Sequence, residues 1–287
     1  MDLKSLDNLI EDIYTSLTPL SGDVALDIDD SLIDEVGESI KKAIKDWATP
    51  TARNARFTLR MSNIGKPARQ LWFENNYGKG DRDVPPHTFI KFLYGHVVEE
   101  LMLMLVKMAG HKVTDEQKEV DVSGIKGHID CKIDGEVVDI KSASPFSFSK
   151  FKQGTLRDDD PFGYIGQLTG YEAAEGTTNG GLLAINKVTG ELALYQPEDL
   201  DKPVTESVIE SLERGFKSHL PPPLCYEPVR DGAKGNMRIS KNCTYCPFKF
   251  KCFDDLRVFK YAKGPQYLST VVVEPRVDEI TDEFQTG

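Results

Sequence analysis

The sequence lacks any apolar run of the roughly 18 residues that a membrane-spanning helix needs. It also begins without the features of a secretory leader, because MDLKSLDNLIEDIY is acidic and carries no apolar stretch. Cysteine is scarce, with five in 287 residues, and an odd number without a leader argues against a disulfide scaffold. We therefore expect a cytoplasmic protein that has no membrane partner.

An excess of positive charge is absent as well, since the formal net charge is −11. The acidic residues are concentrated at the two ends. Residues 1–50 hold 12 acidic and four basic side chains, and residues 265–287 hold five and one. Residues 51–264 keep 29 of the 46 acidic and 30 of the 35 basic side chains. This central part is nearly neutral, which is compatible with local basic patches that bind a polyanion.

The apolar pattern predicts a mixture of helices and strands. Helical periodicity extends over residues 3–17, 31–48, 161–175 and 204–219, and the almost solidly apolar segment 88–109 predicts a buried helix. Alternating residues predict one β-hairpin over 127–141 and a second from 180–186 and 191–196.

The first hairpin carries the most informative chemistry. Asp134-Gly135 between two alternating runs is a strong signal for a two-residue turn, and this turn would place Asp130 opposite Asp139. The period of two then puts apolar side chains on one face, namely Ile129, Cys131, Ile133, Val138 and Ile140. The other face, which points away from this core, carries Asp130, Asp139 and Lys141.

Two opposed carboxylates repel each other, by roughly 3 kcal/mol at about 5 Å and an effective dielectric constant near 20. A divalent cation between Asp130 and Asp139 reverses this sign, and oxygen ligands favour Mg²⁺ or Mn²⁺. With the Lys141 ammonium beside it, such a site has the groups that phosphodiester hydrolysis needs. The alternative is a surface hairpin with scattered charges.

Two further segments add polar residues to apolar surroundings. The helix expected at 88–109 carries the adjacent acids Glu99 and Glu100, of which at least one must point to solvent. In the helix expected at 161–175, Gln167 and Tyr171 lie four residues apart and share one face. Alone, this pair is more often a core tyrosine and a surface glutamine than part of a site.

Taken together, four motifs in this order resemble the PD-(D/E)XK nuclease superfamily, and in particular its RecB-type exonuclease branch. The motifs are Gly95-x₃-Glu99, Gly127-x₂-Asp130, Asp139-Ile140-Lys141 and Gln167-x₃-Tyr171. That branch includes the nuclease associated with CRISPR adaptation and the AddB nuclease domain. The stretches SNIGKPARQLWFE, DDDPFGYIGQL and GNMRISKNCTYCPFKFKC look like those of bacteriophage-encoded members, and the resemblance covers residues 58–256.

The resemblance implies an α/β (α+β) fold with a mixed central sheet flanked by helices. It also implies that Asp130, Asp139 and the main-chain carbonyl of Ile140 bind Mg²⁺ or Mn²⁺ and that Lys141 positions the water. Gln167 and Tyr171 would contact DNA near the scissile phosphate. The RecB-type branch usually has a metal-binding histidine where this chain has Glu99, and other superfamily members use a glutamate there. We therefore include Glu99 among the expected catalytic and metal-binding residues.

Four of the five cysteines lie within 28 residues, which favours a metal site: Cys225, Cys243, Cys246 and Cys252. The spacing alone fits both zinc and iron–sulfur sites. The RecB-type branch has C-x₂-C-x₅-C at this place in a 4Fe–4S site, with a fourth cysteine upstream of the nuclease core. Here Pro67 occupies that upstream position, so Cys225 is the natural substitute, and a structural Zn²⁺ stays open as the alternative. Cys131 is expected to be a small buried side chain.

These expectations give four segments: acidic helices over 1–50, a nuclease core over 51–220, a cysteine segment over 221–264 and an acidic extended tail over 265–287. We expect residues 1–48 to be dispensable for DNA binding. The basic runs Arg53–Arg69 and Lys150–Arg157 are candidate walls of a DNA channel.

The resemblance implies a metal-dependent DNA exonuclease in phage DNA processing, recombination or host-DNA degradation, with phage or host recombination and replication proteins as partners. A structure-specific endonuclease on the same core and a non-catalytic DNA-binding protein stay open as alternatives.

Overall fold

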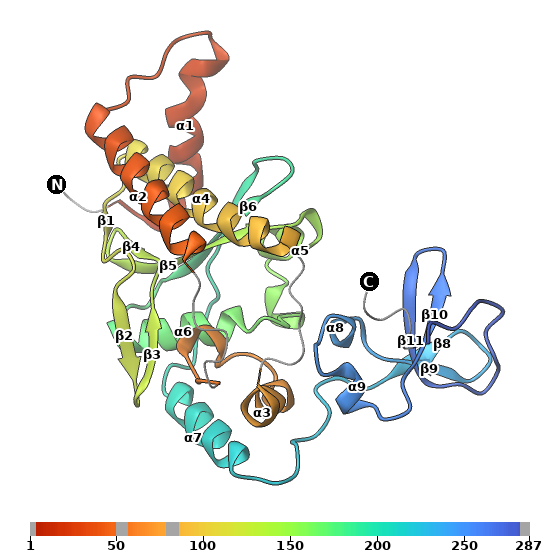
Figure 1. Cartoon of the computed structure of the whole chain (residues 1–287). Coiled ribbons are helices and arrows are strands. Elements are labelled where there is room, and N and C mark those ends of the chain that lie inside the picture. The colour runs from red at the N-terminus through yellow and green to blue at the C-terminus, as the bar shows by residue number, and fades with distance from the viewer. Residues whose placement is uncertain (1–3, 50–56, 79–85, 282–287) are drawn as a thin grey trace. The chain divides into compact units, whose positions relative to one another are not determined.

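The structure is a computed structural model in which residues 4–49, 57–78 and 86–281 are described (Figure 1). This described chain divides into two compact units. Residues 1–55, 59–65 and 84–210 belong to the first unit, and residues 56–58, 66–83 and 211–287 belong to the second. The first unit contains a mixed sheet flanked by helices. The predicted α+β class with a mixed central sheet is therefore confirmed.

The described residues of the first unit form a five-stranded sheet in the order β1-β4-β5-β6-β7. Its strands are β1 (Val113–Thr114), β4 (Cys131–Ile133), β5 (Glu136–Ala143), β6 (Gly181–Asn186) and β7 (Leu192–Tyr195). β5 and β6 are parallel, whereas the other neighbouring strands are antiparallel. The second predicted hairpin, β6–β7, is confirmed. β5 lies in the middle of the sheet, with β4 along one edge and β6 along the other.

The predicted register of the carboxylate hairpin is confirmed over the ladder between β4 and β5, where Cys131 pairs with Val138 and Ile133 with Glu136. Asp134 and Gly135 both have positive φ, of 50° and 93°, as the two-residue turn requires. The predicted start at residue 127 is wrong, because β3 (Ile125–His128) pairs instead with β2 (Glu119–Val122). The chain changes partner at Ile129 and Asp130, just before the hairpin begins.

Helices from the N-terminal part cover the apolar face of the sheet. They are η1 (Leu6–Asn8), α1 (Leu9–Ser21) and α4 (Pro86–Met108), and α2 (Asp30–Ala48) packs on α4. Leu6, Leu9 and Ile13 belong to the same buried cluster as Cys131 and Ile140. The expectation that residues 1–48 are dispensable therefore conflicts with the packing, because their removal would take away part of the core of the first unit.

The helix α4 is buried over only part of its length. Val98, Met102 and Val106 are buried, in agreement with the predicted buried helix. In the first half of α4, however, Ile90 is 66% exposed and Phe92 is 53% exposed. The prediction is wrong for this half, because an apolar run shows that burial is favourable but does not show how far the neighbouring sheet extends.

The opposite face of the sheet carries α5 (Pro145–Gln153), η3 (Leu156–Asp158) and α6 (Tyr164–Glu175), with η2 (Met61–Asn63) packed on α6. Gly127 allows a close approach here. A Cβ atom at this position would lie 2.5 Å from the Met61 Cβ and 2.8 Å from the Tyr171 Cε1. Helix α6 thus covers the face that was expected to point away from the core. The environment of the carboxylates on this face therefore depends on α6.

The second unit has a sheet that the sequence analysis did not predict. Within the described residues it is four-stranded, in the order β10-β11-β9-β8. Its elements are α3 (Ala68–Tyr77), β8 (Val229–Asp231), β9 (Asn236–Arg238), α8 (Lys241–Thr244), α9 (Lys249–Cys252), β10 (Arg257–Tyr261) and β11 (Gly264–Thr270). Phe248, Phe259 and Leu268 are buried in this unit. The strands are short, so their alternation gives little signal in the sequence.

The helix α7 (Val204–Phe216) confirms the helix predicted over 204–219 and precedes three consecutive prolines. No helix within the described residues has the length and apolar character that a membrane span requires.

Candidate active site

Asp139 and Lys141 lie two residues apart on β5 and point to the side of the sheet that α6 covers. Asp139 is only 1% exposed, and among the described residues neither of its carboxylate oxygens has a hydrogen-bond partner. Its contact is an ion pair with the Lys141 Nζ. Burial alone would lower the pKa of Lys141, but the Asp139 and Asp130 carboxylates raise it above the ordinary value. Lys141 is therefore a permanent cation at neutral pH.

Asp130 approaches this pair from the turn between β3 and β4. Its Oδ2 accepts a hydrogen bond of 2.7 Å from the main-chain N–H of Ile140, the residue between Asp139 and Lys141. Burial and the neighbouring Asp139 and Glu99 raise the pKa of Asp130 well above its ordinary value. The predicted pairing of the two aspartates is thus present as an electrostatic contact, although Asp130 itself lies one residue before the strand.

Glu99 on α4 supplies a third carboxylate. Its Oε1 accepts a hydrogen bond of 2.7 Å from the Gln117 Nε2. Burial, and then repulsion from Glu100 and Asp139, raise the pKa of Glu99 to about 7. Glu100 interacts instead with Ser39 of α2, so the structure decides which of the two adjacent acids belongs to the site. The neighbouring His96 is exposed and does not join the core.

Gln167 and Tyr171 form the wall on α6. Both side chains are buried, and the Gln167 Nε2 donates a hydrogen bond of 3.2 Å to the Tyr171 hydroxyl. Burial raises the pKa of Tyr171 to about 12, and the Asp139 and Asp130 carboxylates act in the same direction. The i, i+4 pair predicted from the sequence therefore lies beside the carboxylates.

The structure thus brings together all six side chains that the sequence analysis selected, and it adds two that were missed. The Lys141 Nζ lies 5.0 Å from the centre of the Tyr164 ring, a cation–π contact on the first residue of α6. Tyr164 precedes Gln167 by three residues, so helical spacing could have found it. Gln117, which holds Glu99, lies in a loop and gave no such signal.

The donor set suits a hard divalent cation, because a buried carboxylate without hydrogen bonds is costly unless a positive charge compensates it. Asp130, Asp139 and Glu99 offer oxygen ligands for such an ion. In the arrangement described, however, no three His, Cys, Asp or Glu side chains are close enough together to hold a metal ion, within the residues that the structure describes. The Lys141 ammonium is the cation that compensates Asp139 here.

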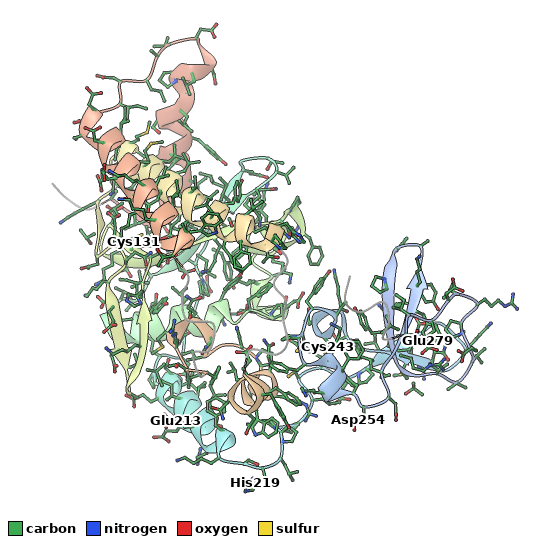
Figure 2. All side chains as sticks on the ribbon, in the orientation of Figure 1. Cys131, Glu213, His219, Cys243, Asp254 and Glu279 are labelled. Carbon is green, nitrogen blue, oxygen red and sulfur yellow. The ribbon has the colours of Figure 1, made fainter. Side chains whose placement is uncertain are left out.

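The remaining candidate cofactor residues are in the second unit, where Cys225, Cys243, Cys246 and Cys252 are half-buried free thiols. Of these, Cys243 is labelled in Figure 2. Burial raises the pKa of Cys243 to about 12, and the three other thiols add to this effect. Cys131, in contrast, is fully buried in the core of the first unit, as expected for a small apolar side chain.

Helix α3 lies against these thiols. Cys246 and Cys252 pack on Trp72, Phe73 and Phe248. The Arg69 Nε donates a hydrogen bond of 3.1 Å to the Cys252 Sγ. Main-chain N–H groups of Gln70 and Arg69, in the first turn of α3, hydrogen-bond to Cys225 and work against the rise of its pKa that burial causes. The first turn of α3, which follows Pro67, therefore contacts Cys225 and Cys252 through hydrogen-bond donors.

No family model matches the chain, and no curated protein sequence matches it. Among solved structures it is similar to the protein SSO0001, with 16% identity and a TM-score of 0.38 over 75% of this chain and 95% of the other. It is similar to the alkaline exonuclease LHK-Exo from Laribacter hongkongensis, with 14% identity and a TM-score of 0.36 over 54% and 89% of the two chains.

A third similarity is to a phage-related exonuclease from Haemophilus somnus 129PT, with 11% identity and a TM-score of 0.40 over 56% of this chain and 94% of the other.

Proposed function

We propose that this protein is a metal-dependent nuclease that hydrolyses phosphodiester bonds of DNA. The observation that carries the proposal is the buried Asp139 carboxylate, which is ion-paired with Lys141 and adjoins the carboxylates of Asp130 and Glu99. Burying several acids in one place is unfavourable for stability alone. A catalytic role gives a reason for an arrangement that folding would otherwise select against.

In this proposal the carboxylates of Glu99, Asp130 and Asp139 and the carbonyl of Ile140 would hold Mg²⁺ or Mn²⁺. Such an ion would lower the pKa of a bound water and neutralise charge on the phosphate. Lys141 stays protonated and stabilises the charge that develops when the water oxygen bonds to phosphorus. The bond from phosphorus to one sugar oxygen then breaks, and that oxygen takes up a proton. Gln167 and Tyr171 position the strand beside the reacting phosphate.

We further propose that the protein acts as an exonuclease. The basis for this is the set of four motifs and their order in the sequence. The cell compartment would be the cytoplasm, in the host if the protein is phage-encoded, and recombination or replication proteins would be its partners. The non-catalytic alternative is disfavoured because Asp130, Asp139 and Lys141 are all present and adjoin one another.

The test uses linear duplex DNA labelled at either end, single-stranded DNA and covalently closed circles, each with Mg²⁺, Mn²⁺ or EDTA. We expect metal-dependent release of label from linear DNA and intact circles. Cleavage of the closed circles would show that the protein acts as an endonuclease and not as an exonuclease. Asp139→Asn and Lys141→Gln should abolish cleavage, whereas Glu38→Gln and Lys41→Gln, an exposed pair on α2, should not. Wild-type protein that cleaves none of these substrates would contradict the proposal.

The four half-buried cysteines lead to a second proposal, that they bind one 4Fe–4S cluster, with a structural Zn²⁺ as the alternative. Two observations support this proposal. The three other thiols raise the pKa of Cys243, and N–H groups of Arg69 and Gln70 donate hydrogen bonds to Cys252 and Cys225. Thiolate sulfurs in iron–sulfur sites commonly accept such hydrogen bonds. Protein purified without oxygen should be brown and absorb near 400 nm, whereas colourless protein with one zinc per chain would favour the alternative. Fully folded protein without either metal would contradict both.

A further inference from the structure

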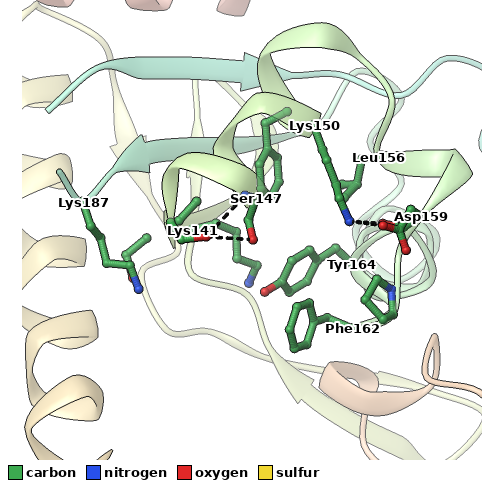
Figure 3. Close-up of a pocket in the computed structure, with 13 residues that line it drawn as sticks. Lys141, Ser147, Lys150, Leu156, Asp159, Phe162, Tyr164 and Lys187 are labelled. Carbon is green, nitrogen blue, oxygen red and sulfur yellow. Dashed lines mark hydrogen bonds and ion pairs between the residues drawn. The ribbon is translucent and has the colours of Figure 1, made fainter. Parts of the chain in front are cut away.

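A cavity of about 270 Å³ opens beside Lys141 (Figure 3). Its walls come from the end of β5, from α5, from the loop before α6 and from the turn after β6. None of the acids Glu99, Asp130 and Asp139 lines it. The cavity is therefore a separate compartment that shares Lys141 with the proposed catalytic site.

One side of the cavity is positively charged. Lys141, Lys150 and Lys187 line it, and Asp159 is its only acidic residue. Lys150 is paired with the Asp159 Oδ2 at 2.5 Å, whereas exposed Lys187 has no acidic partner among the residues that the structure describes. The hydroxyl groups of Ser144 and Ser147, at the start of α5, lie on the same side. Ammonium and hydroxyl groups of this kind bind phosphate oxygens.

The other side of the cavity is aromatic. The Phe162 ring is stacked on Tyr164, with ring centres 5.5 Å apart and an angle of 23° between the planes. Phe162 is 57% exposed, and its position at the cavity is visible in Figure 3. A large apolar ring held in the open by a stacking partner leaves one face available to a flat ligand. Proteins that bind single-stranded nucleic acids use such rings as stacking platforms for bases.

We propose that this cavity binds one unpaired nucleotide of the DNA strand, next to the phosphate that is cleaved. The base stacks on Phe162, and its phosphate contacts Lys187 and the two serine hydroxyls. The inference rests on the proposed nuclease function and specifies its substrate, because a base that stacks on a side chain must leave its duplex partner. The substrate class is therefore a single strand or a frayed end.

The experiment measures binding without cleavage, in EDTA, by fluorescence anisotropy. The probes are a labelled oligothymidylate of eight nucleotides and a series in which one nucleotide at a time lacks its base. For the wild-type protein we expect one position at which loss of the base weakens binding about tenfold, since stacking on an aromatic side chain has about this effect. The other positions should matter less.

Variants connect this position to Phe162. Phe162→Leu should remove the difference between the intact and the base-free probe, and Phe162→Trp should keep it. Phe92→Leu is the matched control, because Phe92 is a similarly exposed phenylalanine on α4 and should leave the difference unchanged. Lys187→Gln should weaken binding of all probes alike and reduce the slope of affinity against salt by about one.

Equal affinity for all probes would overturn the inference, as would a difference that persists in Phe162→Leu or a protein that binds none of the probes. Its failure is distinct from a failure of the proposed function. If the protein cleaves DNA but binding depends on the base at no position, the nuclease function stands and this subsite does not. A base-dependent position in a protein that never cleaves DNA leaves a single-strand binding site without the catalytic function.

Discussion

The carboxylate site of the first unit and the cysteine site of the second differ in what holds their side chains in place. Asp139 and Lys141 are on a central strand, Glu99 is on a long helix, and each carboxylate has a fixed neighbour in hydrogen-bonding or ion-pair contact. The thiols are on two four-residue helices and adjoining loops, and packing on α3 is their main support. The first arrangement is fixed by a central strand and a long helix, whereas the second rests on short elements and their packing against α3.

The second unit nevertheless has a core of its own. Phe248, Phe259 and Leu268 are buried there, and four described strands pair with one another. From the sequence alone, residues 221–253 are expected to need a metal to become ordered, because they contain three consecutive prolines and few periodic apolar positions. The packing corrects this, since part of the unit is held by apolar contacts. Loss of metal should therefore disturb the cysteine segment more than the sheet.

The largest expected effect is the loss of DNA cleavage when one charge of the first site is removed. Asp139→Asn and Lys141→Gln should lower DNA cleavage by about a thousandfold or more, because each removes a charge that acts on the reacting phosphate. Both replacements keep nearly the same volume, but Lys141→Gln leaves the buried acids without their cation and should also lower the thermal unfolding midpoint, whereas Asp139→Asn should change it less. Initial rates and unfolding curves of the same preparations check both statements. Wild-type rates in either variant would remove the residue from the site.

The next effect concerns the second site. Cys243→Ser should lower metal content and stability together, since metal bound to thiolates contributes on the order of 10 kcal/mol to folding. Cys131→Ser is the matched control in the first unit. It should cost about 1–3 kcal/mol, because a hydroxyl replaces a thiol in an apolar core, and it should leave the metal content unchanged. Metal analysis and thermal unfolding distinguish the two. Equal metal loss in both variants would contradict the assignment.

A smaller expected effect is a pH dependence of stability, which comes from the repulsion among the carboxylates of the first site. In metal-free protein the raised pKa of Glu99, about 7, means that the folded chain holds a proton that the unfolded chain has already lost. Between about pH 5 and pH 7 the free energy of unfolding should therefore decrease as the pH rises, by up to about 3 kcal/mol. Glu99→Gln should reduce this slope and Glu38→Gln should not. Urea unfolding in EDTA at several pH values measures it, and an unchanged slope in Glu99→Gln would contradict the prediction.

The smallest expected effect is the change in stability when either of two glycines of the motifs, Gly127 and Gly95, is replaced by alanine. Gly127→Ala should destabilise the protein by about 1–3 kcal/mol, because the new methyl group would meet Met61 and Tyr171. At Gly95, in the middle of α4, no described atom lies within 4 Å of an added Cβ. Gly95→Ala should therefore stabilise the helix by up to about 1 kcal/mol. Chemical unfolding checks the opposite signs, and a loss of stability at Gly95 would show a contact that this packing does not contain.

The sequence by itself determined the local parts of this protein. The Asp134-Gly135 turn fixed the register of β4 and β5, and the period of two placed Cys131 in the core and Asp139 with Lys141 on the other face. A turn and an alternating pattern involve residues close together in the chain, so their geometry can be worked out locally.

Only the tertiary structure decided the rest. It selected Glu99 over Glu100, placed α6 over Asp139 and gave the second unit a sheet. Each of these depends on how elements that are distant in the sequence pack. The rotation of α4, the cover of a strand and the pairing of short strands are set by apolar surfaces elsewhere in the fold, which no local pattern contains.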